Sequence, residues 1–184
     1  MSDSNTFSEQ LKKQFAAHFS HEPNAEQAVA INELIHFTAH SGKNTCFILK
    51  GYAGTGKTSL LGAYIQSLAV LKRKTVLMAP TGRAAKVLSL KSKKVATTIH
   101  KRIYFPKKAK TGGVSFTLQQ NKFKNTIFIV DESSMISDTS QDSKLYANGS
   151  LLDDLFFYVE AGNNCKLLLI GDTAQLPPVN MTVS

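Results

Sequence analysis

The residues with the clearest chemical signature lie in Gly51–Thr58, which reads Gly-Tyr-Ala-Gly-Thr-Gly-Lys-Thr and fits G-x-x-x-x-G-K-[ST] at every fixed position. Its glycines allow consecutive backbone N–H groups to turn inward around a phosphate without Cβ clashes. A helix that begins at Lys57 adds the partial positive charge of its N-terminus. We therefore predict a triphosphate site in which Lys57 reaches the β- and γ-phosphates and the Thr58 hydroxyl binds Mg²⁺. The predicted contacts from this segment are Gly51, Ala53, Gly54, Thr55, Gly56, Lys57, Thr58 and Ser59.

A second candidate is a pair of carboxylates, Asp131 and Glu132, directly after the apolar run Ile127–Val130. Asp131 suits a contact to Mg²⁺, and Glu132 is placed to polarise an attacking water, which indicates hydrolysis rather than phosphoryl transfer to a substrate. The alternative for either residue singly is an N-cap on a following helix.

A third candidate follows another apolar run, in Gly171-Asp172-Thr-Ala-Gln175. The Gln175 amide could hydrogen-bond a γ-phosphate or the attacking water. This turn has no meaning without the other two segments, and together they give a predicted catalytic set of Lys57, Glu132 and Gln175.

These side chains must be positioned by alternating strands and helices. Short apolar runs predict buried strands, and longer segments with helical spacing of apolar residues predict the helices between them. The predicted strands are 46–50, 75–79, 127–130 and 166–170, and the predicted helices are 23–40, 57–71, 82–90 and 151–159. Strands alternating with helices, and apolar at every position, indicate an α/β fold with a parallel sheet covered on both faces.

Three segments fall outside this alternation. Residues 1–21 are expected to be a flexible N-terminus, with the domain running from 22 to 184. Residues 103–124 place aromatic and β-branched residues around Thr111-Gly112-Gly113, which predicts an inserted basic β-hairpin. Asp138–Ser150 is polar and is expected to be a mobile loop.

Composition narrows the class of protein. The chain has 184 residues, of which 42% are hydrophobic and 19% charged, as in one compact domain. A polar start and the lack of a long apolar run give no indication of a signal peptide or a membrane partner. Cys46 and Cys165 each open a predicted buried strand, so we expect inert core thiols and a reducing, cytoplasmic compartment.

The distribution of charge is more informative than its net value of +9. Residues 34–130 contain no carboxylate, yet they hold 18 of the 22 Lys and Arg residues. A field of this kind suits a polyanion, and nucleic acid is preferred over a solvated basic face or an anionic membrane.

Together the motifs resemble the N-terminal RecA-like motor domain of superfamily 1 DNA helicases, in the RecD-like or Dda-like branch of the P-loop NTPases. Gly51–Thr58 resembles motif I of this family, Ala79–Lys86 resembles motif Ia, and Thr97–His100 resembles motif Ib. Asp131-Glu-Ser-Ser-Met135 is similar to motif II of the RecD-like branch, and Gly171–Pro178 to motif III. Glu26-Gln27 is similar to the N-terminal glutamine motif.

The resemblance implies an ATP-dependent helicase or translocase with ATP and Mg²⁺ as cofactors. It implies that Gln27 reads the adenine edge, and that single-stranded DNA or RNA contacts Pro80, Thr81, Arg83, Thr98 and His100. It places the hairpin at 103–124 in the position of a strand-separating 1B subdomain. There Phe105, Phe116 or Phe123 either stacks on a base or forms the hairpin's own small core.

The resemblance further implies a second RecA-like domain that completes the ATP site. Because the chain stops at Ser184, we expect a monomeric piece of a longer protein that binds nucleotide with weak or absent turnover. Two alternatives stay open: a nucleic-acid-binding P-loop ATPase switch without unwinding activity, and a P-loop kinase or GTPase. For a GTPase, the segment Asn121-Lys122-Phe-Lys124 lacks the Asp that reads guanine.

Overall fold

A five-stranded parallel sheet forms the centre of the computed structural model, which describes residues 2–39, 45–52, 54–108, 114–136 and 146–172. Its strands are β1 (Thr45–Gly51), β2 (Lys74–Ala79), β3 (Ala96–Thr98), β6 (Thr126–Val130) and β7 (Lys166–Asp172). They lie in the order β1-β7-β6-β2-β3, and every pair is parallel. The predicted α/β fold with a parallel sheet is therefore confirmed. Sequence patterning missed β3, because a strand of three residues has no periodicity to detect.

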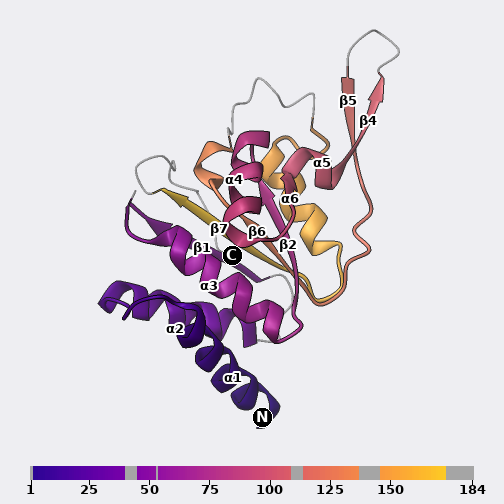
Figure 1. Cartoon of the computed structure of the whole chain (residues 1–184). Coiled ribbons are helices and arrows are strands. Elements are labelled where there is room, and N and C mark those ends of the chain that lie inside the picture. Colours follow the sequence, from indigo (N-terminus) through magenta and orange to yellow (C-terminus); the bar gives the residue numbers. More distant parts are fainter. Residues whose placement is uncertain (1, 40–44, 53, 109–113, 137–145, 173–184) are drawn as a thin grey trace.

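Helices cover both faces of this sheet (Figure 1). One face packs against α2 (Ala25–Ala39), α3 (Lys57–Val70) and α4 (Gly82–Ser92), and α1 (Ser2–His18) packs outside this layer on α2 and α3. The other packs against α5 (Ile99–Ile103) and α6 (Leu151–Glu160). In β6, Ile127 and Ile129 face the first layer, while Phe128 and Val130 face the second. This two-sided burial explains why the strands are apolar at every position.

The N-terminal segment differs from the expected flexible terminus. The structure places residues 2–18 in α1, where Leu11 is 0% and Phe15 is 1% exposed. The Phe15 ring lies 6.0 Å from that of Tyr64 in α3, and Arg73 stacks on Phe7 at 4.4 Å. Polar residues dominate this segment, so its sparse apolar positions gave a weak signal in the sequence. Because those positions share one helical face, α1 becomes part of the domain core.

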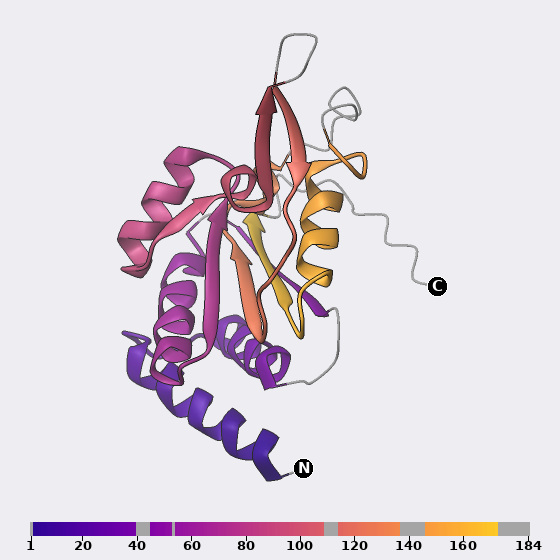
Figure 2. The same cartoon turned by 90° about the vertical axis from the view of Figure 1, so that its right-hand side faces the viewer.

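The insertion at 103–124 contains an antiparallel hairpin of β4 (Tyr104–Lys108) and β5 (Val114–Leu118), which projects beyond the sheet in both views (Figures 1 and 2). Two of the three candidate aromatic residues pack against the core of the domain rather than forming a separate core of the hairpin. Phe116 packs 5.2 Å from Tyr104, and Phe123 packs edge-on at 5.4 Å from Phe128, so both belong to the core. Phe105 is 57% exposed and is available for stacking.

The base of the hairpin is fixed by a buried carboxylate. Asp154 of α6 is 0% exposed and accepts the Tyr104 hydroxyl at 2.5 Å. It also accepts the backbone N–H groups of Ala147 and Asn148 at 3.0 and 2.9 Å, and the Asn148 amide at 2.6 Å. One side chain thus joins the hairpin, α6 and the 146–148 turn. Most of the predicted mobile loop, residues 138–145, lies outside the described residues.

Both cysteines are free thiols, as predicted. Cys165 is buried, and burial raises the pKa of the half-buried Cys46 to about 12, so neither is activated as a thiolate. Within the described ranges, each helix is too short or too polar to cross a bilayer.

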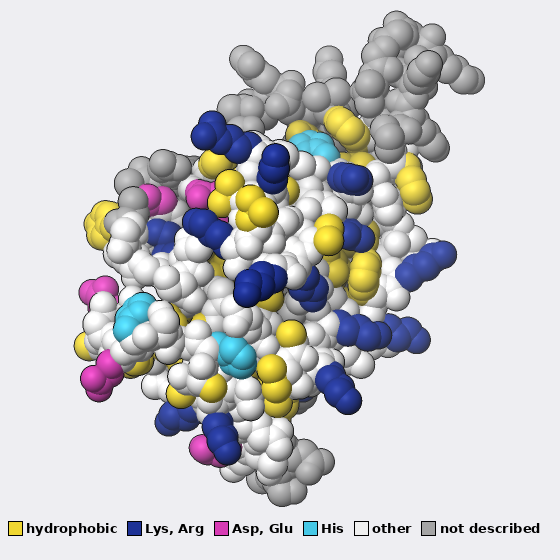
Figure 3. Space-filling model, in the orientation of Figure 1, with side chains coloured by type: hydrophobic (Ala, Val, Ile, Leu, Met, Phe, Trp, Pro, Cys, Tyr) yellow, Lys and Arg dark blue, Asp and Glu magenta, His cyan; other side chains and the backbone are white. Residues whose placement is uncertain are grey.

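Charge is distributed unevenly over the surface. In the view of Figure 3, dark blue Lys and Arg side chains gather along the right-hand side, and the magenta Asp and Glu side chains lie at the left and at the lower edge. This separation follows from the absence of any carboxylate in residues 34–130.

Candidate nucleotide site

The loop between β1 and α3 has the backbone of a phosphate cradle. Gly54 and Gly56 have φ angles of 82° and 84°, in the left-handed region that favours glycine. Gly56 is also the N-cap of α3, and a Cβ there would lie 2.7 Å from the Gln27 amide nitrogen. The left-handed backbone therefore disfavours a side chain at Gly56, and a Cβ there would also displace the end of the Gln27 side chain. Ala53, a predicted contact, lies outside the described residues.

Lys57 folds back over this loop. Its ammonium group donates to the carbonyl oxygen of Gly51 and, at 2.7 Å, to that of Tyr52. These carbonyls hold the positive charge beside the loop N–H groups, where a phosphate would need it.

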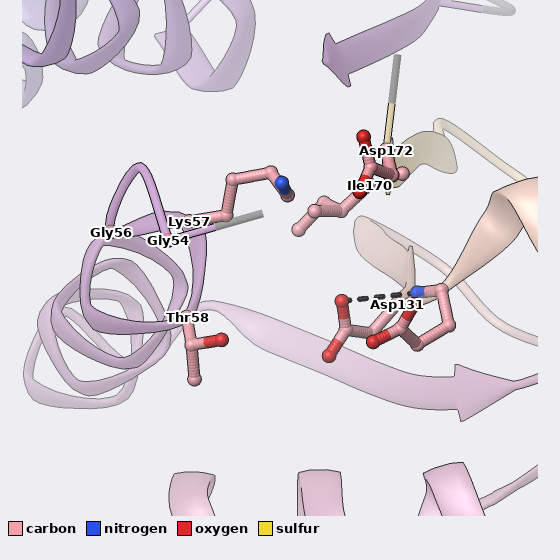
Figure 4. A pocket seen from close by; sticks show the side chains of 9 residues that line it. Gly54, Gly56, Lys57, Thr58, Asp131, Ile170 and Asp172 are labelled. Atoms are coloured by element: carbon pink, nitrogen blue, oxygen red, sulfur yellow. Dashed lines mark hydrogen bonds between the residues drawn. The ribbon is translucent and has the colours of Figure 1, made fainter. Parts of the chain in front are cut away.

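A pocket of about 380 Å³ opens beside the loop at the carboxyl ends of β1, β6 and β7. It is lined by Gly54, Gly56, Lys57, Thr58, Asp131, Glu132, Ile170, Gly171 and Asp172. Figure 4 shows Lys57 and Thr58 on one side facing Asp131 and Asp172 on the other. Segments whose pocket residues are 38 to 118 positions apart in the chain meet here because the strands are parallel and end at one edge. The structure thus brings together Lys57, Thr58, Asp131 and Glu132 of the predicted set.

Asp131 is held in an orientation that suits a cation. Its backbone N–H donates to Met78 at 3.1 Å, and its Oδ1 accepts from the Glu132 N–H at 3.0 Å. Burial raises the pKa of this carboxyl, and the negative charge of Glu132 raises it further. The hydrogen bond from the Glu132 N–H and the positive charges of Lys91 and Lys57 lower the pKa, but by less than burial raises it. A half-buried carboxylate opposite a hydroxyl is a fitting place for Mg²⁺, whose charge would offset the cost of desolvating the carboxylate.

The rest of a Mg²⁺ shell would come from outside this pair. Among the described residues, no three His, Cys, Asp or Glu side chains are grouped to hold a metal ion. Mg²⁺ is often held by only one or two protein oxygens, with phosphate oxygens and waters completing its octahedron. The donor set of Thr58 and Asp131 fits that pattern.

Glu132 has a left-handed backbone, with φ 56°, and an exposed side chain. It is the N-cap residue of the short 3₁₀ helix Ser133–Met135, but its side chain makes no capping hydrogen bond. Its carboxylate is therefore not used by the helix that follows, which favours the predicted role in polarising water over the N-cap alternative.

Asp172 is a pocket residue that the sequence did not single out. It lies opposite Gly51 in the β1–β7 register, at the end of an apolar strand, just as Asp131 follows Val130. A Gly-Asp pair after an apolar run was the available signal. Gln175 lies outside the described residues, so its predicted place is untested.

Gln27 forms a capping box with Asn24 at the start of α2 and also links this helix to the loop. Its N–H donates to the Asn24 side chain at 2.9 Å, and its Oε1 accepts from the Asn24 N–H at 3.1 Å. Its Nε2 donates to the Thr55 carbonyl at 3.1 Å. Beside it a second hollow of about 270 Å³ is lined by Gln27, Tyr52 and Lys57, among others. Gln27 therefore lies between the loop and a space next to the phosphate cradle. Of the remaining predicted contacts, Thr58 and Ser59 are exposed in the first turn of α3.

The predicted nucleic-acid contacts meet at the same sheet edge. Ala79 and Thr98 are partners in the β2–β3 register, so Pro80 and Thr81 continue beside Thr98. Thr81 caps α4 by accepting from the Ala84 N–H at 3.2 Å, and Thr98 caps α5 by accepting from Lys101 at 3.2 Å. Arg83 is exposed near the start of α4.

His100 is enclosed more than expected for a surface contact. It is half-buried, its Nε2 lies 3.3 Å from the Tyr146 hydroxyl, and its ring packs 5.3 Å from Phe116. Burial lowers its pKa, so the ring is neutral at pH 7.

Comparison with known proteins identifies the family. A family model described as an AAA domain matches residues 35–181, most of the chain. The chain belongs to this AAA domain family. The AAA domain is 33% identical over 134 residues to the ATP-dependent RecD2 DNA helicase of Deinococcus radiodurans, which aligns 72% of this chain with 16% of that protein. It is 31% identical over 153 residues to an uncharacterized protein of Methanocaldococcus jannaschii, and this alignment covers 74% of this chain and 12% of that protein.

The crystal structure of the Pif1 helicase from Candida albicans has the same fold as this AAA domain, with a TM-score of 0.51 at 21% identity over 86% of this chain and 34% of that one. The resemblance to the RecA-like motor domain of superfamily 1 helicases is thereby confirmed. The chain spans 12% and 16% of the length of the two curated relatives.

Proposed function

We propose that this domain binds ATP and Mg²⁺ in the Gly51–Thr58 pocket and single-stranded DNA or RNA at the adjoining edge, as the motor domain of an ATP-dependent helicase or translocase. The observation that carries the proposal is the convergence of a cation and a hydroxyl, Lys57 and Thr58, with the half-buried carboxylate of Asp131 across one pocket. Glu132, beside that carboxylate, is exposed and makes no capping hydrogen bond, and a kinase would not need a second carboxylate of this kind.

Each pocket residue has a proposed role. The loop N–H groups and the Lys57 ammonium bind phosphate oxygens, and Gln27 contacts the base in the hollow beside the loop. Thr58 and Asp131 hold Mg²⁺, which neutralises charge on the phosphates when bound. Glu132 accepts a proton from the attacking water, and Gln175 orients that water.

The proposed single-strand surface comprises Pro80, Thr81, Arg83, Thr98 and His100. Because Arg83 is the charged member, it supplies the phosphate contact. His100, neutral and packed among aromatic rings, would act as a hydrogen-bonding group. Exposed Phe105 on the hairpin would stack on a base.

We further propose that turnover requires a second RecA-like domain, supplying a cation to the transition state. The chain studied alone should therefore bind nucleotide but turn over well below the usual enzyme range of about 1–10³ s⁻¹. Steady-state ATP hydrolysis within that range, stimulated by single-stranded DNA, would contradict this requirement.

A nucleic-acid-binding ATPase switch without unwinding activity is the second candidate, favoured by the same pocket and the same basic surface. An unwinding assay on a forked duplex, with the motor domain in its full-length protein, separates the two. Strand separation supports the helicase, and nucleotide-dependent binding without separation supports the switch.

The direct test of the nucleotide site is Lys57→Ala, measured by titration with a fluorescent ATP analogue and Mg²⁺. Loss of the ammonium should weaken binding by about tenfold or more, since charge-assisted hydrogen bonds contribute roughly 1.5–3 kcal/mol. The matched control is Lys13→Ala, which removes one exposed lysine from α1. Equal affinity of the Lys57→Ala and Lys13→Ala proteins would refute the assignment.

A further inference from the structure

Two groups of basic residues lie at opposite edges of the sheet. Arg83 and Lys101 lie on α4 and α5, just beyond the carboxyl ends of β2 and β3. A separate group lies on the segments that lead into β2, β3 and β6, at their amino ends. We call this group the amino-edge lysines: Lys72, Lys74, Lys93, Lys94 and Lys124.

The strand register and one hydrogen bond bring the segments that carry Lys74, Lys94 and Lys124 side by side. Lys74 pairs with Thr126 in the β2–β6 register, two residues after Lys124. The Lys94 ammonium donates to the Thr75 hydroxyl, directly after Lys74. Neighbouring strands are about 4.8 Å apart, so three adjacent strands bring these residues within roughly 10 Å across the sheet. That width is about three phosphate steps of a nucleic-acid strand, at roughly 3.4 Å each.

No carboxylate neutralises this surface. None of the five lysines forms an ion pair with any part of the chain that the structure describes, and all are exposed except half-buried Lys94. In the view of Figure 3, no magenta Asp or Glu side chain is seen among the dark blue Lys and Arg side chains of the right-hand side.

Two of these lysines occupy backbone positions that disfavour them. Helix α3 ends in a Schellman motif, with Arg73 N–H donating to Leu68 at 2.8 Å and Lys72 N–H to Ala69 at 3.0 Å. Its left-handed residue, usually Gly or Asn, is Lys72, with φ 54°. Helix α4 also ends in a left-handed lysine, Lys93, with φ 53°. A helix dipole favours lysine near a C-terminus but does not require it at the left-handed position. At both positions a lysine stands where the backbone conformation prefers Gly or Asn, and such local conflicts are expected at binding surfaces.

We infer that the amino-edge lysines form a second nucleic-acid surface that binds the phosphate backbone of a duplex, separate from the single-strand surface. Lysine is a point charge suited to phosphate rather than to bases. Among the described residues, no exposed aromatic side chain lies on the segments that carry these lysines, so single-stranded bases have nothing to stack on. A duplex keeps its bases stacked inside and presents its phosphates on the outside, where lysines can bind them without stacking on a base. The two surfaces would let one domain hold a single strand and a duplex at opposite edges.

The test is the variant Lys72→Asn/Lys93→Asn in the full chain, with a labelled 20-base-pair duplex and a labelled oligothymidylate titrated at several KCl concentrations. Asn is well tolerated in the left-handed region, so the thermal midpoint should not fall. Duplex affinity should fall several-fold. The slope of log K against log salt should also shrink by about 1.8, or 0.9 for each lost phosphate contact. Oligothymidylate affinity should stay near native.

Two comparison variants complete the design. Lys72→Arg/Lys93→Arg keeps the charge and should bind duplex as the native chain does. Arg83→Gln/Lys101→Gln removes the same charge at the other edge and should lower oligothymidylate affinity instead. Native duplex affinity and slope in the asparagine variant, or an equal loss for both probes, would overturn the inference. Loss of duplex binding there, with no effect of the Arg83 variant on oligothymidylate, would overturn the proposed single-strand surface alone.

Discussion

Asp131 is the residue whose chemistry depends most on what the fold does to it. Its burial raises the pKa of a carboxyl that is ionised in the unfolded chain at pH 7. A raised pKa in the folded state means that this group's contribution to stability is fully present below the unfolded pKa of about 3.9. That contribution is lost as the pH rises through the folded value. Without a bound cation, the ionised carboxylate therefore destabilises the domain at neutral pH.

Replacing that carboxyl should separate stability from ligand binding. In the ligand-free chain at pH 7, we expect Asp131→Asn to raise the thermal midpoint, because the amide carries no charge to desolvate. The gain should shrink as the pH falls and the native carboxyl becomes protonated. Nucleotide affinity should lose its Mg²⁺ dependence in the same variant. Differential scanning calorimetry between pH 4 and 8, and titrations with and without Mg²⁺, measure both; a lowered midpoint with intact Mg²⁺ dependence would contradict this role.

Site residues were predictable where a strand or loop motif fixed their position. Lys57, Thr58, Asp131 and Glu132 lie in contiguous motifs next to apolar runs, and parallel strands bring such motifs to one edge. Asp172 also lies at the end of an apolar strand and lines the pocket, but the sequence analysis gave it no role. The Gln27 link to Thr55 is a contact 28 residues apart that depends on how α2 packs, which no local pattern encodes.

At the scale of elements, α1 shows where patterning failed. Leu11 and Phe15 are spaced as neighbours on one helical face, but the polar residues between them hid that face. Burial of these side chains against α2 and α3 is a tertiary effect, and it overrides the weak local signal.

The anchoring of α1 predicts a large effect from one substitution. Phe15→Ala should lower the free energy of unfolding by about 3–5 kcal/mol, as for other buried phenylalanines. Lys13→Ala, two residues away and exposed, should change it by less than about 0.5 kcal/mol. Urea unfolding curves of both variants provide the comparison. Similar curves for the two would mean that α1 is detached from the core in solution.

The carboxylate at the base of the hairpin makes a second prediction at this scale. Asp154→Ala should cost about 3 kcal/mol or more, since it leaves several buried donors without an acceptor. Tyr104→Phe removes one donor and should cost about 1 kcal/mol. The double variant should be less destabilised than the sum, because the two side chains contact each other. Strict additivity in thermal unfolding would show that the Tyr104–Asp154 bond contributes nothing.

At the scale of the whole molecule, one edge of the sheet carries both the nucleotide pocket and the proposed single-strand contacts. The phosphate-binding loop follows β1, Asp131 follows β6, Thr81 follows β2, and Thr98 is the last residue of β3. Strand β6, which leads to Asp131, pairs directly with β2, which leads to Pro80 and Thr81, so the pocket and the proposed single-strand surface lie at the ends of adjacent strands. This adjacency gives the two ligands a short physical route for coupling.

The most direct measurement is the dissociation constant of a fluorescent ATP analogue with Mg²⁺, in the presence and absence of saturating oligothymidylate. Coupled sites typically change each other's affinity by about 5- to 150-fold, and the effect is reciprocal. We expect a shift in that range for the native chain, and no shift for Arg83→Gln, which still has an intact pocket. Identical nucleotide affinity with and without the oligonucleotide, under conditions where both are bound, would contradict a nucleic-acid motor.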